Sequence, residues 1–290
     1  MSWQLALVAL IVVNTASVVL TKVAADRLPK KSIGLFFQYL ICAILTIGFA
    51  VFTGKSSFNS TLLLIAGVGF INAFGNYFQW HASAISLSKT TLFFPLMEVS
   101  TIVLAMLFLQ EIALWNFQLI VGASLCFAAM WLFKLPQKNS NTAKETILGS
   151  KWLFSIVAMI LIFGIAGFLL KVFSFTVPRE SFLMSWYAGA FVASLPILVL
   201  EKQNPFNISR KVVLIVAPVA LAIIGALLML YWTYQLGGPV SLVLPIRGIA
   251  IALIPVFLGW RLFHEKKGLS RKEWIGFLTG ACGATLVLLR

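Results

Sequence analysis

Two charged side chains, Glu98 and Arg247, lie deep inside long apolar stretches of the sequence. A charge near the centre of a bilayer costs at least about 2.5–3.5 kcal/mol, so an ionisable residue there is a functional candidate. Glu98 is suited to attract a cationic group or to carry a proton, and Arg247 is suited to hold a carboxylate or phosphate through two hydrogen bonds. The alternative is a salt bridge that only holds the fold together.

The two charges are expected at a similar depth. At about 1.5 Å per residue, Glu98 lies ~13 Å from the turn at Lys89 and Arg247 ~12 Å from the turn at Pro239. If those turns lie on opposite faces of a core about 30 Å thick, both charges lie near its midplane. They could then pair, or face each other across a cavity in which a small zwitterion such as an amino acid would satisfy both.

Two stripes of polar side chains have helical spacing within apolar runs. They are Asn72, Asn76 and Gln79 in the third run, and Asn14, Ser17 and Thr21 in the first. Residues three or four apart share one face of a helix. Inside a membrane such groups need partners from another helix or from water in a cavity. The stripes therefore predict either a polar cavity lining or hydrogen bonds that only hold helices together.

Tyrosines and prolines add to the candidate site. Tyr231 and Tyr234 precede a Gly-Gly turn, and rings at a cavity there would suit an aromatic or cationic ligand. Core packing or an interfacial belt is the alternative for them. Pro95 and Pro245 lie within apolar runs, where a proline frees a backbone carbonyl and favours a hinge or a simple kink.

The elements that must position these residues are apolar helices. Of 290 residues, 61% are hydrophobic and 10% are charged, and the mean hydropathy is +1.01. A soluble domain has about 25% charged residues, so the composition predicts an all-α membrane protein. Ten apolar runs are near 3–22, 32–53, 61–80, 90–109, 114–133, 152–174, 181–200, 212–235, 240–262 and 273–289.

The chain divides into two similar halves. A polar stretch at 136–150 is expected to be a linker between a five-helix half at 1–135 and a second one at 151–290. A shift of 150 residues places Gly75 on Gly225 and Pro95 on Pro245, and a shift of 154 places Glu111 on Glu265. Since five is odd, the second half must enter the membrane in the opposite sense. The prediction is ten transmembrane helices as two inverted repeats, an architecture common in secondary transporters.

Basic residues give an orientation. Loops after the odd-numbered runs hold 17 Lys or Arg and the opposite side holds four. The positive-inside rule then places the odd-numbered loops in the cytoplasm and both termini outside.

The pattern resembles the drug/metabolite transporter superfamily, in particular its ten-helix EamA-like members. The resemblance rests on a turn, a proline about seven residues on, an apolar helix, a glutamate and a helix containing glycine. In the first half this pattern reads Ser88-Lys89-Thr90-Thr91-Leu92-Phe93-Phe94-Pro95, then Glu111 and Gly122. In the second half it reads Gly238-Pro239-Val240-Ser241-Leu242-Val243-Leu244-Pro245, then Glu265 and Gly276.

The resemblance implies alternating access around a central cavity lined by the first, third and fourth helices of each half. It implies a secondary transporter in the inner membrane that moves a small polar or zwitterionic metabolite such as an amino acid or amine, often outward. It also implies cytoplasmic termini, which opposes the charge count. No cofactor is expected, and coupling to protons or sodium is left open. The substrate, the direction of transport and the coupling ion stay undetermined.

Other classes are disfavoured by the residues. The chain's one aspartate, Asp26, is expected in a loop, and no H-E-x-x-H or G-x-S-x-G motif is present, so we expect no enzyme. The net charge of +14 lies mostly in short loops, which disfavours nucleic acid as a partner. The expected partners are the lipid bilayer and a small solute. Gly276-x-x-x-Gly280 with Gly283 predicts a close-packing face, within one chain or in a homodimer. A non-transporting scaffold or sensor, and less so a membrane enzyme, are the alternatives.

Overall fold

A computed structural model shows an all-helical chain, with no strand among the residues that it describes. The described residues are 2–55, 59–94, 96–97, 100–101, 104, 107–108, 117–134, 143–173, 176–204, 210–237, 240–264 and 271–288. The predicted all-α class is confirmed.

The helices follow the apolar runs. Their bounds are α1 (Trp3–Arg27), α2 (Lys31–Phe52), α3 (Ser60–Ile85), α4 (Leu87–Thr91), α6 (Phe117–Lys134), α7 (Ala143–Phe173), α8 (Arg179–Leu200), α9 (Arg210–Gln235), α10 (Val240–Leu262) and α11 (Arg271–Leu288). Six helical segments of the described chain are long and apolar enough to cross a membrane, in α1, α2, α3, α7, α8 and α9. This number fits a membrane protein, and the full count of ten spans stays a prediction.

Helix α7 begins earlier than the apolar pattern suggests. Its described part runs from Ala143, inside the stretch 136–150 that the composition favours as a linker. Ala, Lys and Glu near that start have high helix propensity, so a helix continues there without apolar residues. The part of this helix apolar enough for a membrane runs over Ser150–Leu170.

The chain folds as two compact units. Unit 1 comprises Met1–Trp80 and Leu169–Val243, and unit 2 comprises His81–Phe168 and Leu244–Arg290. Each unit draws segments from both halves of the sequence, so the compact units do not coincide with the halves 1–135 and 151–290. The reason is that the helix pairs with the closest packing join helices from different halves.

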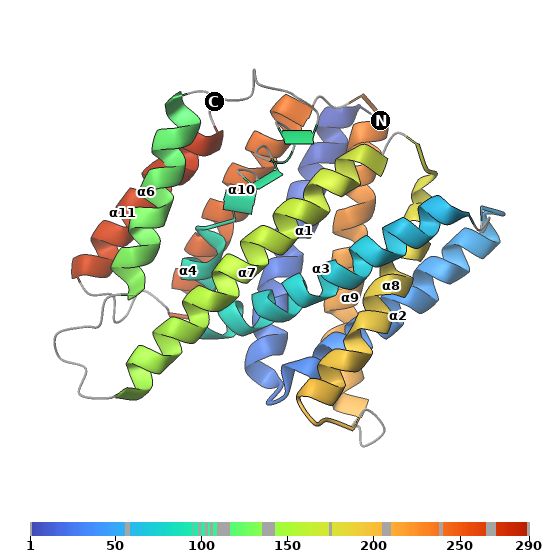
Figure 1. The fold of residues 1–290 in the computed structure, drawn as a ribbon, viewed down its shortest axis with the longest axis horizontal. Helices are drawn as coiled ribbons and strands as arrows, with labels where there is room; N and C mark the ends of the chain where they lie inside the picture. Colours follow the sequence, from blue (N-terminus) through green and yellow to red (C-terminus); the bar gives the residue numbers. More distant parts are fainter. Residues whose placement is uncertain are drawn as a thin grey trace. The chain divides into compact units, whose positions relative to one another are not determined.

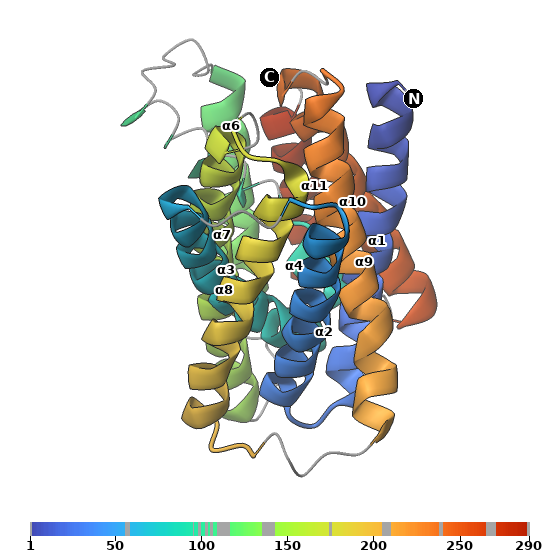
Figure 2. The same ribbon diagram turned by 90° about the vertical axis from the view of Figure 1, so that its right-hand side faces the viewer.

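In unit 1, α2 packs against α8, and α1 packs against α9 (Figure 2). Helices α3 and α8 approach each other through glycines. A Cβ atom on Gly69 would lie 2.0 Å from the Trp186 carbonyl oxygen, and one on Gly189 would lie 1.8 Å from the Ala66 carbonyl oxygen. Only glycine therefore allows the two backbones to lie this close.

In unit 2, α6 and α11 lie side by side (Figure 1). A Cβ atom on Gly283 would lie 2.7 Å from the Gly122 carbonyl oxygen, and Gly280 faces Ala129 and Cys126. Gly280 and Gly283 thus form a close-packing face within one chain. The predicted homodimer stays a prediction.

Helices at corresponding places in the two halves match where their ends lie among the described residues. Helices α2 and α8 have 22 residues each and begin 148 residues apart. Helices α3 and α9 end at Ile85 and Gln235, which are 150 residues apart. The offsets are close to those at which the sequence motifs recur.

The ends of α2 and α8 also match. Gly54 and Lys202 follow the two helices with φ of 68° and 52°. The N–H of the next residue, Lys55 or Gln203, donates in each case to the carbonyl five residues earlier, at 2.9 Å. This is a common way to end a helix and usually uses glycine, so Lys202 adopts a strained conformation that its counterpart adopts freely.

Candidate functional site

A carboxylate ties three helices together at one end of unit 1. Ser32 Oγ at the start of α2 donates to Glu201 Oε2 at 2.6 Å, and the Tyr77 hydroxyl of α3 donates to Glu201 Oε1 at 2.7 Å. Glu201 directly follows α8 and is half-buried. Hydrogen bonds to charged groups are about twice as strong as neutral ones, so this contact fixes α2, α3 and α8 at this end.

Deeper in the same unit, an amide and an indole form a buried pair. Trp80 Nε1 of α3 donates to Gln38 Oε1 of α2 at 3.2 Å, and both side chains are fully buried. The Trp80 ring packs on Gly34, where a Cβ would lie 2.8 Å from the ring. Gln38 Nε2 is buried and has no hydrogen-bond partner among the described residues.

A tyrosine pair lies beside this amide. The rings of Tyr39 in α2 and Tyr187 in α8 are 6.5 Å apart, and both residues are buried. The Tyr187 hydroxyl donates to the Ile223 carbonyl of α9 at 3.1 Å. The Tyr39 hydroxyl lies near Asn76, yet no group in the described part of the chain makes a well-formed hydrogen bond to it. We call Gln38, Tyr39, Asn76 and Trp80 the α2–α3 cluster.

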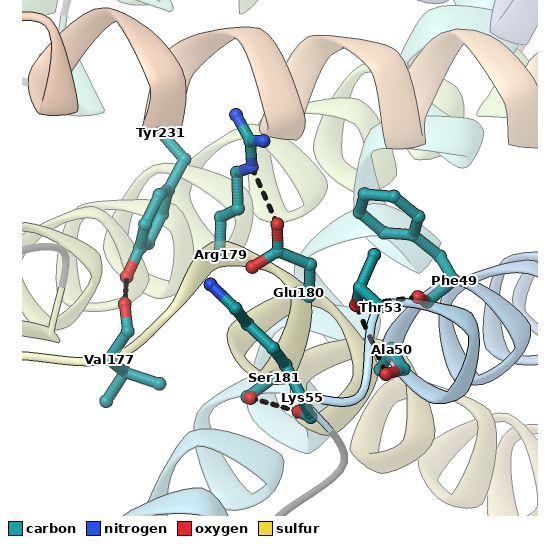
Figure 3. A network of polar contacts seen from close by, with 9 residues as sticks. All are labelled: Phe49, Ala50, Thr53, Lys55, Val177, Arg179, Glu180, Ser181 and Tyr231. Carbon is teal, nitrogen blue, oxygen red and sulfur yellow. Dashed lines mark hydrogen bonds and ion pairs between the residues drawn. The ribbon is translucent and has the colours of Figure 1, made fainter.

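A second polar network lies at the opposite end of the α2–α8 pair (Figure 3). Arg179 Nε is 2.9 Å from Glu180 Oε1, and the Arg179 guanidinium lies 5.6 Å from the centre of the Trp232 ring. Lys55 points toward the Glu180 carboxylate, and Ser181 Oγ donates to the Lys55 carbonyl at 2.5 Å. Glu180 is buried, so its charge is balanced by two basic side chains.

The predicted aromatic site residues lie near this second network in the fold of unit 1. The Tyr231 hydroxyl donates to the Val177 carbonyl, in the connection that precedes α8 (Figure 3). The Phe173 carbonyl is also within reach of this hydroxyl. The Tyr231 ring packs 5.0 Å from the Phe182 ring. Tyr234 is buried in α9. In this structure the Tyr231 hydroxyl serves to hold the start of α8.

Within the predicted polar stripes, neighbouring members of each helix contact each other. Ser17 Oγ donates to the Asn14 carbonyl at 2.7 Å, and Asn76 Nδ2 donates to the Asn72 carbonyl at 3.3 Å. Ser17 and Asn76 are buried, whereas Asn14, Asn72 and Gln79 are half-buried. Asn76 is the member that the structure places beside a further polar group, Tyr39.

The predicted charge pair is only in part described. Arg247 lies in α10 and is half-buried, and its Nε atom is buried without a hydrogen-bond partner among the described residues. Glu98 and Pro95 lie outside the described residues, and Pro245 is described only as part of the α10 backbone. The pairing of Glu98 with Arg247 therefore stays a prediction.

Sequence reasoning missed the residues that join α2 to α3 and α8. Gln38 is a strongly polar residue within the second apolar run, and that signal could have marked it. Glu201 follows the last apolar residue of its helix, where an acidic side chain is typical of solvent contact. Lys22, buried near the end of α1 and 3.0 Å from Asp26, was also not singled out as a site residue.

Comparisons with known proteins bear on the fold alone. No family model and no curated protein matches the sequence. A solved structure described as "Crystal structure of protein" is similar over 99% of this chain and 96% of its own, with a TM-score of 0.60 and 16% sequence identity. The chain thus shares its helical fold with a solved protein at an identity too low to indicate function.

Proposed function

We propose that this protein is a secondary transporter of the drug/metabolite transporter superfamily. It moves a small polar or zwitterionic metabolite across the inner membrane by alternating access, in the outward direction. The observation that carries this proposal is the correspondence of α2 with α8 and of α3 with α9 at a nearly constant offset, at which sequence motifs also recur. Halves of this kind are typical of secondary transporters built from inverted repeats.

The packing of unit 1 supports the repeat. Tyr39 and Tyr187 each follow the first residue of their helix by eight positions, and their rings pack against each other. Equivalent residues of two related helices meet in this way where a twofold axis relates the helices. The similar ends of α2 and α8, at Gly54 and Lys202, support the same relation.

Polar groups within the apolar helices support a solute pathway. Gln38, Tyr39 and Arg247 each have a buried polar atom with no hydrogen-bond partner in the described part of the chain. Such groups are costly among apolar side chains unless a partner reaches them. A transporter provides that partner when water or solute enters.

Flux into proteoliposomes tests the proposal. Purified protein is reconstituted into liposomes. Counterflow of labelled amino acids, amines, nucleosides or organic acids is then measured, one class at a time. We expect saturable counterflow of one class, and its loss in Glu98→Gln and Arg247→Ala. Phe52→Leu, at a side chain that is 90% exposed, serves as the control and should retain flux.

The contrary result is also informative. A protein that unfolds cooperatively but moves no member of the panel would favour a scaffold or sensor. Thermal stability provides an independent check, because a ligand at 100 times its dissociation constant stabilises by about 2.7 kcal/mol.

A further inference from the structure

The α2–α3 cluster contains two adjacent residues of α2 whose polar atoms lack partners. Gln38 and Tyr39 are each 0% exposed, and neither Gln38 Nε2 nor the Tyr39 hydroxyl makes a well-formed hydrogen bond among the described residues. Both face the same turn of α3, since Gln38 contacts Trp80 and Tyr39 lies near Asn76. The large majority of buried side-chain polar atoms in proteins are paired, so two unpaired groups against one helical turn indicate a missing partner.

The chemistry of the missing partner follows from the Trp80–Gln38 contact. An indole N–H can only donate, so the oxygen of the Gln38 amide must face Trp80 and its NH₂ group must face away. The Trp80 ring cannot retreat easily, because it packs on Gly34 with no room for a Cβ. The amide therefore presents N–H donors, and the Tyr39 hydroxyl adds an O–H donor.

The corresponding tyrosine of α8, Tyr187, is buried as well, but its hydroxyl has a hydrogen-bond partner. Tyr187 packs against Tyr39, yet its hydroxyl donates to the Ile223 carbonyl. The two residues thus have similar burial and different hydrogen bonding. Of the two tyrosines, Tyr39 is the one whose hydroxyl has no well-formed hydrogen bond among the described residues.

We propose that Gln38 and Tyr39 bind an oxygen acceptor, a carbonyl or hydroxyl, of an uncharged polar solute. The groups of the cluster are two amides, a phenol and an indole, and none of them would neutralise an ion at physiological pH. A buried ion without a partner is strongly disfavoured, so the α2–α3 cluster favours neutral ligands. The inference rests on the proposed transport function only in that the bound solute is the transported one.

Binding to the purified full-length protein in nanodiscs tests the inference. The probes are three uncharged solutes, nicotinamide, uridine and glucose, each paired with a charged analogue, nicotinate, uridine monophosphate and gluconate. We expect an uncharged member to bind more tightly than its analogue. Tyr39→Phe should weaken that binding about tenfold, and Gln38→Glu, which keeps the acceptor for Trp80, should weaken it similarly. Tyr187→Phe is the matched control and should bind as the parent protein does.

Three results would overturn the inference. They are binding of no uncharged probe, tighter binding of the charged analogues, and unchanged binding in Tyr39→Phe. The last result would mean that water alone is the partner of Gln38 and Tyr39. Flux is measured separately on the same variants. Flux that is equal in the parent and in Tyr39→Phe overturns the proposed binding by Gln38 and Tyr39 but not the proposed transport function. Tyr39-dependent binding without flux supports the proposed binding and contradicts the transport function.

Discussion

Placing an alanine at the α3–α8 crossing should destabilise the protein strongly. A Cβ on Gly69 would lie 2.0 Å from the Trp186 carbonyl oxygen, whereas ordinary contacts begin near 3.4 Å. Gly69→Ala thus requires the two backbones to separate by about 1.4 Å. The obstacle is backbone rather than a flexible side chain, so local rotation cannot relieve the contact.

The expected cost follows from the usual penalty for overpacking. Inserted methyl groups in packed interiors cost about 1–3 kcal/mol, and a backbone obstacle favours the upper end. For a chain of this size, each kcal/mol lowers Tm by roughly 2–4 °C. We therefore expect Gly69→Ala to unfold roughly 6–12 °C below the parent, measured by thermal unfolding in detergent.

Gly67 provides the matched control on the same helix. A Cβ there meets no atom within 4 Å, and replacing a helical glycine by alanine gains about 0.8–1 kcal/mol of helix propensity. Gly67→Ala should therefore match or exceed the parent Tm. Equal Tm values for the two variants would refute the reasoning.

The double variant sharpens the test. Gly189→Ala meets the Ala66 carbonyl at the same crossing, and one separation of the helices relieves both contacts. Gly69→Ala combined with Gly189→Ala should therefore cost less than the sum of the single variants. An additive result would mean that the two glycines do not share one contact.

Two further predictions concern unit 1. Tyr77→Phe removes a hydrogen bond to the Glu201 carboxylate and should cost about 1.5–3 kcal/mol, measured by chemical unfolding. Ser124→Ala, at an exposed hydroxyl bonded to its own helix, should change stability by less than about 0.5 kcal/mol; a similar loss in both variants would contradict the role of Glu201. Lys202→Gly should stabilise by about 1 kcal/mol and Gly54→Ala should destabilise by a similar amount, because both positions adopt positive φ. A gain of stability in Lys202→Gly and a loss in Gly54→Ala, measured in the same unfolding assay, would support this interpretation. A loss of stability in Lys202→Gly would contradict it.

The helices were predictable because proline, glycine and polar residues mark their ends in the sequence. The second run was expected at 32–53 and α2 covers Lys31–Phe52, since Pro29 precedes it and Gly54 ends it. The start of α7 at Ala143 was not, because polarity there suggested a linker. Apolar content reveals which segments a membrane accepts, but helix propensity decides where a helix begins.

The site was less predictable because its contacts are distant in sequence. Ser32 and Glu201 are 169 residues apart, Tyr77 and Glu201 are 124 apart, and Gln38 and Trp80 are 42 apart. The pattern of one helix shows which face is polar but not which helix covers that face. Asn76 was predicted as a site residue from spacing alone, and its neighbour Tyr39 emerged only from the fold.

The two ends of the α2–α8 pair use unlike chemistry, and dissolved salt distinguishes them. At one end hydroxyl groups hold the Glu201 carboxylate. At the other end the ionic contacts involve Arg179, with a third of its side chain exposed, and the exposed Lys55. Dissolved salt weakens interactions between solvent-exposed charges, with a screening length of about 8–10 Å at physiological ionic strength, but it scarcely affects a short hydroxyl–carboxylate bond. Raising ionic strength should therefore weaken the ionic contacts at the Arg179 end, where the hydrogen bond from Ser181 to the Lys55 carbonyl remains, and should scarcely affect the Glu201 end.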